Sequence, residues 1–73
     1  MRTFSTDKSS NIKGLSYDDM NNSLVVEFKN GGKYLYEDVP IELYESFVKA
    51  DSVGKFFFAN VRGKYKFQKL TGL

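Results

Sequence analysis

The chain has 73 residues, with 11 Lys and Arg against 9 Asp and Glu, and a formal net charge of +2 at pH 7. This length predicts one small domain spanning residues 1–73. Cys is absent, which excludes disulfides and thiolate metal sites, and His is absent, which removes the commonest metal ligand and acid–base catalyst. We therefore expect no metal site and no cofactor.

The charges are segregated along the chain. Residues 1–51 carry six basic and nine acidic residues, whereas residues 52–73 carry five basic residues and no acidic one. This segregation favours an anionic partner or an electrostatically matched self-contact, and the alternative is a solvated basic face that keeps the protein soluble.

The beginning of the chain is mostly polar. Residues 1–8 predict a loose arm, with no apolar signal segment, and no apolar run in the chain approaches the length of a membrane span. We therefore expect a soluble, cytoplasmic protein that does not bind a membrane.

Three strands are predicted next. Residues 11–17 favour a strand with a possible bulge at Gly14, and residues 24–28 alternate apolar and polar side chains. Residues 30–32 read Asn-Gly-Gly, which suits a tight hairpin turn into a return strand over residues 33–37. Short connections predict an antiparallel meander.

Two helices should follow. Pro40 suits a first helical position, and the spacing of Leu43, Phe47 and Ala50 predicts an apolar stripe that covers one face of the sheet. Ser52 is a candidate N-cap for a second short helix from Val53 to about residue 60. The chain should end in a basic extended segment, frayed over residues 70–73. The predicted fold is therefore α+β: a three-stranded antiparallel meander, two short helices and this C-terminal segment.

Catalysis finds little support in these residues. Ser–His and Cys–His arrangements are impossible, and the neighbouring acidic pairs at residues 18–19 and 37–38 fit solvated turns better than a pair of catalytic carboxylates. We expect a protein that is not an enzyme.

The second half of the chain interleaves cations with aromatic rings, which is typical of single-stranded nucleic-acid binding. The candidate anion ligands are Arg62, Lys55, Lys64, Lys66 and Lys69. Tyr65 and Phe67 are candidate stacking rings, although the same rings could belong to the core. Phe58 falls off the helical stripe and, if exposed, would suggest a partner surface together with Tyr34 and Tyr36.

One family resemblance covers residues 9 to 65. It is carried by the order Ser9-Ser10-Asn11-Ile12, Tyr17-Asp18, Leu24-Val25-Val26-Glu27-Phe28, Gly31-Gly32-Lys33-Tyr34-Leu35-Tyr36, Asp38-Val39-Pro40, Ser52-Val53-Gly54-Lys55-Phe56-Phe57 and Val61-Arg62-Gly63-Lys64-Tyr65. This order resembles the KTSC domain, named for its occurrence at the C-terminus of some lysyl-tRNA synthetases and also found in short bacterial and phage proteins. Phe58 departs from the family pattern, in which a polar residue is expected.

The resemblance implies a single α+β module with no known catalytic residues, and its attachment to a tRNA synthetase points by association to RNA. Our leading hypothesis is a binding module for nucleic acid or a nucleotide, with Arg62 as the main phosphate contact because of its planar fork. The alternative is a module for protein–protein interaction or homo-oligomer formation, such as a phage or host accessory factor.

Overall fold

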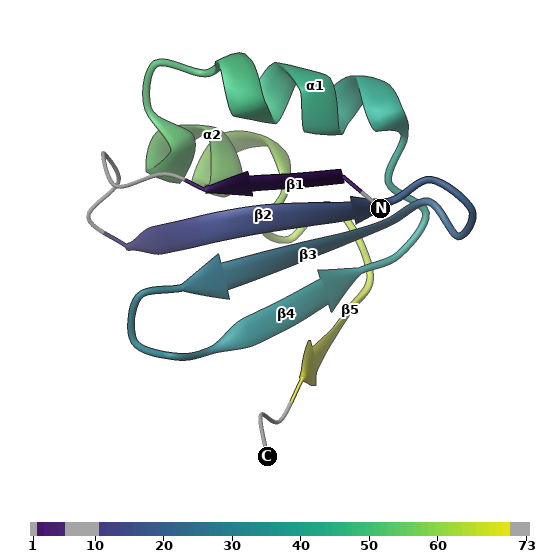
Figure 1. Ribbon diagram of the computed structural model, residues 1–73, viewed down its shortest axis with the longest axis horizontal. Coiled ribbons are helices and arrows are strands. Elements are labelled where there is room, and N and C mark those ends of the chain that lie inside the picture. Colours follow the sequence, from purple (N-terminus) through teal and green to yellow (C-terminus); the bar gives the residue numbers. More distant parts are fainter. Residues whose placement is uncertain (1, 6–10, 71–73) are drawn as a thin grey trace.

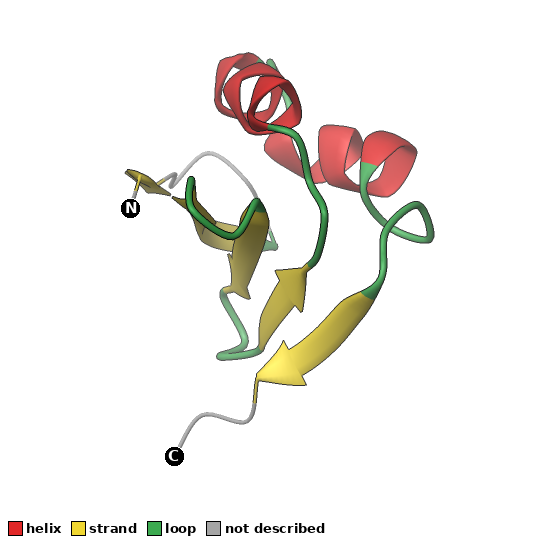
Figure 2. Ribbon diagram, turned by 90° about the vertical axis from the view of Figure 1, so that its right-hand side faces the viewer, coloured by secondary structure: helices red, strands yellow, loops and turns green. Residues whose placement is uncertain are grey.

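The computed structural model describes residues 2–5 and 11–70 and shows two helices on one face of an antiparallel sheet (Figures 1 and 2). The elements, in chain order, are β1 (Arg2–Ser5), β2 (Ile12–Asp18), β3 (Ser23–Phe28), β4 (Lys33–Tyr36), α1 (Ile41–Lys49), α2 (Val53–Asn60) and β5 (Phe67–Leu70). The five strands lie in the sheet in the order of the chain. Both helices are therefore inserted between two strands that pair with each other.

The central hairpin follows the predicted alternation. Leu15 pairs with Val26 and Tyr17 pairs with Leu24, and all four side chains are buried beneath the helices. The register shifts between Ile12 and Gly14, as the predicted bulge requires. A Cβ atom on Gly14 would lie 3.0 Å from the backbone oxygen of Phe4, so glycine lets β1 approach β2 closely.

The helices begin and end near the predicted residues. Pro40 has an extended backbone and is the N-cap of α1, so the helix starts one residue later than predicted. The Ser52 side chain accepts a hydrogen bond from the backbone N–H of Lys55 at 3.3 Å, which confirms the predicted N-cap of α2. Tyr44 and Phe47 of α1 and Phe57 of α2 are buried aromatic residues that close the core.

The predicted α+β class is confirmed and the three predicted strands are present as β2, β3 and β4, but the sheet has five strands rather than three. Residues 2–5 of the expected loose arm form β1, which pairs with β2, while residues 1 and 6–8 lie outside the described residues. Residues 67–70 of the expected extended segment form β5, which pairs with β4, and residues 71–73 lie outside the described part. These two strands are the edges of the sheet, and each has only four residues.

No helix within residues 2–5 and 11–70 is long and apolar enough to cross a membrane. The same residues contain no group of three or more carboxylates that could share a metal ion.

Candidate functional site

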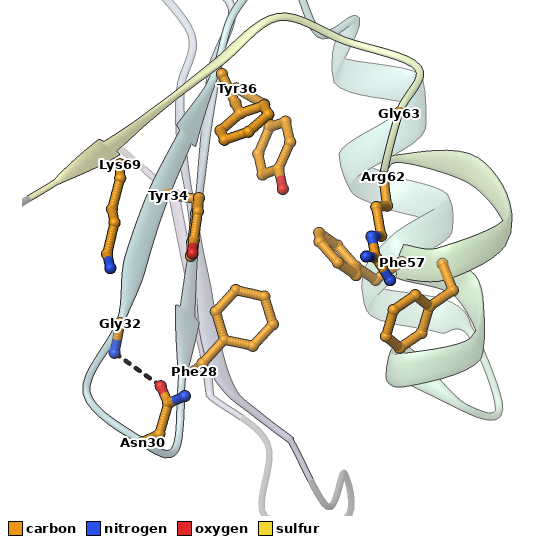
Figure 3. Close-up of a pocket in the computed structure, with 11 residues that line it drawn as sticks. Phe28, Asn30, Gly32, Tyr34, Tyr36, Phe57, Arg62, Gly63 and Lys69 are labelled. Atoms are coloured by element: carbon orange, nitrogen blue, oxygen red, sulfur yellow. Dashed lines mark hydrogen bonds between the residues drawn. The ribbon is translucent and has the colours of Figure 1, made fainter.

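A pocket of about 690 Å³ opens between α2 and the part of the sheet that contains β4 and β5 (Figure 3). One wall comes from α2 and the turn after it, the other from β4 and β5, and the β3–β4 hairpin closes one end. Its lining residues are Phe28, Asn30, Gly32, Tyr34, Tyr36, Phe57, Phe58, Arg62, Gly63, Phe67 and Lys69. The lining therefore contains six aromatic rings and two cations, but no carboxylate.

The sheet wall is built by cross-strand pairs. Tyr36 lies opposite Phe67 and Tyr34 lies opposite Lys69, so alternation turns all four side chains to the face that carries the helices. The Phe67 ring lies 5.6 Å from the rings of both tyrosines, yet this residue is 55% exposed. The Phe67 ring therefore packs against two tyrosine rings and still exposes an aromatic face to the solvent.

The helix wall starts from a buried ring. Phe57 packs edge-on against Phe28 at 5.4 Å and against Tyr36 at 5.9 Å, which joins the two walls at the base of the pocket. Phe58 is the next residue on α2 and is 52% exposed, with its ring edge-on to Phe57 at 5.5 Å. The guanidinium carbon of Arg62 lies 5.2 Å from the centre of the Phe58 ring, within the range of a cation–π contact.

The backbone of Arg62 is held in position by a hydrogen bond and by a buried neighbouring residue. Its N–H donates to the carbonyl of Phe57 at 2.9 Å, and the preceding Val61 is fully buried. Gly63 then has a φ of +77°, a left-handed conformation that costs glycine little, and the chain turns toward β5. Arg62 is therefore held just after the end of α2, beside the pocket (Figure 3).

Arg62 has no ion-pair partner in the described part of the chain. The two ion pairs found there are Arg2 with Asp19 and Lys13 with Glu27, and none of these four residues lines the pocket. Burial raises the pKa of Tyr36, the neighbouring Tyr34 raises it further, and the positive charge of Arg62 opposes this shift. The Tyr36 hydroxyl thus stays neutral near pH 7 and available as a hydrogen-bond donor.

The hairpin end of the pocket is held by a side chain. The Oδ1 atom of Asn30 accepts a hydrogen bond from the Gly32 N–H at 2.9 Å (Figure 3). Gly31 between them has a φ of +95°, as the predicted tight turn requires. This turn is stabilised by its own hydrogen bonds, and Asn30 and Gly32 line that end of the pocket.

The structure brings together residues that the sequence assigned to different roles. Arg62 and Lys69 from the anion set, Phe67 from the stacking set, and Phe58, Tyr34 and Tyr36 from the partner-surface set line the same pocket. Tyr36, however, is only 4% exposed, so the expectation that it offers a free anchor to a partner is wrong. Its ring is held inward by Phe57 and Phe67.

The other candidates lie outside the lining. Lys55, Lys64 and Lys66 are exposed but do not line the pocket, and Tyr65 is half-buried against the core. Lys66 precedes the first residue of β5 and is exposed outside the lining. These three lysines contribute positive charge around the site rather than within it.

Sequence reasoning missed Phe28 and Phe57 as lining residues. Both belong to apolar faces of their elements. A hairpin of β3 and β4 already implied that Phe28 shares a face of the sheet with Tyr34, and the two rings lie 5.6 Å apart. Gly63 was not predicted as a lining residue either. Its place beside Arg62 depends on the return of the chain to β5, which no local pattern indicates.

Known proteins place the chain in a family. The family model for the KTSC domain matches residues 8–65. The chain belongs to the KTSC domain family. The solved structure of a KTSC domain protein from Yersinia pestis superposes with a TM-score of 0.89 at 31% sequence identity, covering 96% of this chain and 97% of that one. The resemblance stated from the sequence is therefore confirmed.

Two relatives differ greatly in length. An uncharacterized protein of Stutzerimonas stutzeri is 42% identical over 50 residues, which cover 68% of this chain and 70% of that protein. The lysine–tRNA ligase of Nostoc punctiforme is 37% identical over 60 residues, covering 82% of this chain but only 11% of the ligase. The KTSC domain thus stands within a much larger enzyme in one relative and makes up most of the chain in the other.

Proposed function

We propose that this protein is a binding module for a phosphate-bearing ligand, nucleic acid or a nucleotide, and that the pocket between α2 and β5 is the binding site. The observation that carries the proposal is Arg62, a guanidinium at an aromatic pocket without a carboxylate partner in the described residues. An arginine held in this way can form two parallel hydrogen bonds to phosphate oxygens.

The surroundings of Arg62 support this proposal. Lys69 supplies a second cation from the opposite wall, and residues 52–70 contain no acidic residue that would repel a phosphate. Phe67 offers an exposed ring on which a base can stack. The chain is also related to lysine–tRNA ligases, whose name refers to an RNA, and this relation supports RNA binding by association alone.

The test compares two variants that remove the same charge. Arg62→Gln and Lys64→Gln alter exposed residues two positions apart, but only Arg62 lines the pocket. Fluorescence anisotropy with labelled RNA, labelled single-stranded DNA and labelled nucleotides should detect binding at low salt that weakens steeply toward moderate salt. We expect the Arg62 variant to lose about tenfold in affinity and the Lys64 variant less than about twofold.

Two results would end the proposal. If none of these ligands binds at low salt, the module does not recognise nucleic acid or nucleotides. If both variants weaken binding equally, the basic segment acts as a diffuse charge and the pocket is not the site.

A second candidate function is self-association or capture of a protein partner. It is favoured by the exposure of Phe58 at 52% and Phe67 at 55%, two rings that border the same pocket. Light scattering at high protein concentration tests it, since a partner surface used for self-association predicts a dimer that Phe58→Asp dissociates. A monomer at every concentration would exclude self-association.

A further inference from the structure

We propose that the pocket takes a single nucleotide unit, a nucleoside monophosphate, whose base stacks on Phe67 and whose phosphate lies between Arg62 and Lys69. This inference rests on the proposed function and names the ligand class for the same site. It differs from a track for single-stranded nucleic acid, in which affinity grows with the number of nucleotides bound.

The size of the pocket argues for one small ligand. Its volume of about 690 Å³ falls in the usual range for small-molecule sites, which is about 300–1,000 Å³. The β3–β4 hairpin closes one end of this space, and Phe28 and Phe57 meet at its base. A bound base would therefore contact both walls and the hairpin end of a pocket that is open to solvent on one side.

The charge of the lining matches one phosphate monoester. Such a group carries about −1.5 to −2 charges at pH 7, and the lining offers two cations, Arg62 on the helix wall and Lys69 on the sheet wall. A longer strand would need further cations in line with these two. The remaining candidates, Lys55, Lys64 and Lys66, are exposed but are not in the lining.

The position of the exposed ring argues for a base. Phe67 and Lys69 are two residues apart on β5, so the ring and the ammonium group project from the same face of one strand. The two tyrosine rings behind Phe67 hold it in place, and it remains 55% exposed. The Lys69 ammonium group can therefore contact the phosphate of a nucleotide while the neighbouring Phe67 ring stacks on the base of the same nucleotide.

The experiment measures affinities by calorimetry or NMR titration at low salt for AMP, GMP, CMP and UMP. Ribose 5-phosphate supplies the phosphate without a base, adenosine supplies a base without phosphate, and an oligonucleotide of about eight residues supplies length. We expect at least one monophosphate to bind about tenfold more tightly than ribose 5-phosphate and adenosine, and to compete with the oligonucleotide for the site.

A variant isolates the stacking. Phe67→Leu keeps an apolar side chain at a half-exposed position and should fold normally. It should lower the affinity for the monophosphate about tenfold, to the level of ribose 5-phosphate, while the affinity for ribose 5-phosphate stays unchanged.

The outcomes separate the two proposals. If the oligonucleotide binds at the pocket but no monophosphate competes with it, the single-nucleotide inference is overturned and the proposed function stands. If ribose 5-phosphate binds as tightly as the monophosphates, the site recognises phosphate alone and the inference is overturned too. If neither oligonucleotide nor monophosphate binds, both proposals fail.

Discussion

The two halves of the space between the helices and the sheet are built differently. In the half beneath α1, Tyr17, Leu24 and Phe47 are fully buried, and the ring of Tyr17 stacks on that of Tyr44 at 5.4 Å. In the half beside α2, Phe58 and Phe67 are each more than half exposed and a pocket remains. The first half is filled as a core requires, and the second keeps aromatic surface in contact with water.

Hydrogen bonding follows the same division. The Tyr17 hydroxyl donates to the carbonyl of Val39 and lies 3.2 Å from Oδ1 of Asn22. Burial, with Asp19 and Glu42 nearby, raises the pKa of Tyr17, so the hydroxyl stays protonated. The closed half thus uses its polar groups internally, whereas the Arg62 guanidinium and the Tyr36 hydroxyl in the open half have no hydrogen-bond or ion-pair partner among the described residues. This difference is the reason for placing ligand binding in the open half.

The largest expected effect separates the two halves by stability. Phe47→Ala removes a ring that is 0% exposed in the closed half and should destabilise the domain by about 3–5 kcal/mol. Phe67→Ala in the open half should cost less than about 1 kcal/mol. Guanidinium unfolding followed by circular dichroism measures both, and similar losses for the two variants would contradict the division.

Tyrosine hydroxyls give a second, smaller contrast. Tyr17→Phe leaves the buried carbonyl of Val39 without its donor and should cost about 1–3 kcal/mol of unfolding free energy. Tyr36→Phe should cost less than about 0.5 kcal/mol, because no described group accepts a hydrogen bond from that hydroxyl. A large loss for Tyr36→Phe would show that its hydroxyl is part of the packed core.

Two of the lysines near the C-terminal end, Lys66 and Lys69, differ in their position relative to the pocket. Lys69→Gln removes a lining cation, whereas Lys66→Gln removes the same charge from a residue outside the lining. We expect about a fivefold loss of nucleotide affinity for the first and less than about a twofold loss for the second. Equal losses in the anisotropy assay would mean that only the net charge of the segment matters.

Phe58 should affect the site through Arg62. Phe58→Leu keeps an apolar side chain but removes the aromatic face beneath the guanidinium, and we expect about a two- to fivefold loss of affinity with little change in stability. Phe58→Tyr retains the ring and should bind like the wild type. If the leucine variant also binds like the wild type, Phe58 does not position Arg62.

The smallest expected effect concerns pH and the turn between β2 and β3. The carboxylate of Asp18 accepts hydrogen bonds from the Asn21 amide and the Met20 N–H, and these contacts lower its pKa. A lowered pKa means that the charged form stabilises the folded state. The contribution is therefore complete above the ordinary aspartate pKa and is lost as the pH falls through the lower, folded value. An NMR titration of the Asp18 carboxyl group should give a midpoint below that of Asp18 in the unfolded chain.

The sequence predicted the local elements well and the long-range pairing poorly. The hairpin of β3 and β4, the bulge at Gly14 and the N-cap at Ser52 all depend on neighbouring residues, which a pattern can reveal. The strands β1 and β5 are short edges with few apolar residues, and they are recognisable only through their partners. Period and propensity do not indicate that Tyr36 pairs with Phe67 across two helices.

The inability of local patterns to reveal strand pairing also explains why the site was predicted only in part. The types of its residues, cations beside rings, were apparent from the composition of residues 52–73. Which of them meet depends on β5 lying beside β4, since this pairing brings Phe67 and Lys69 into the pocket that Arg62 also lines, whereas Lys66 precedes β5 and is outside the lining. Phe67, which was assigned to stacking, therefore shares one pocket with the rings assigned to a partner surface, whereas Tyr65 does not.

The most direct test of the central claim is a two-dimensional NMR titration of labelled protein with AMP and with a short single-stranded RNA. The account predicts that the amides of Gly32, Gly63 and Lys69 shift together, because they border the pocket from three sides. Amides of the closed half, such as those of Leu24 and Phe47, should stay in place. Shifts confined to the exposed lysines outside the pocket, or no shifts at all, would contradict it.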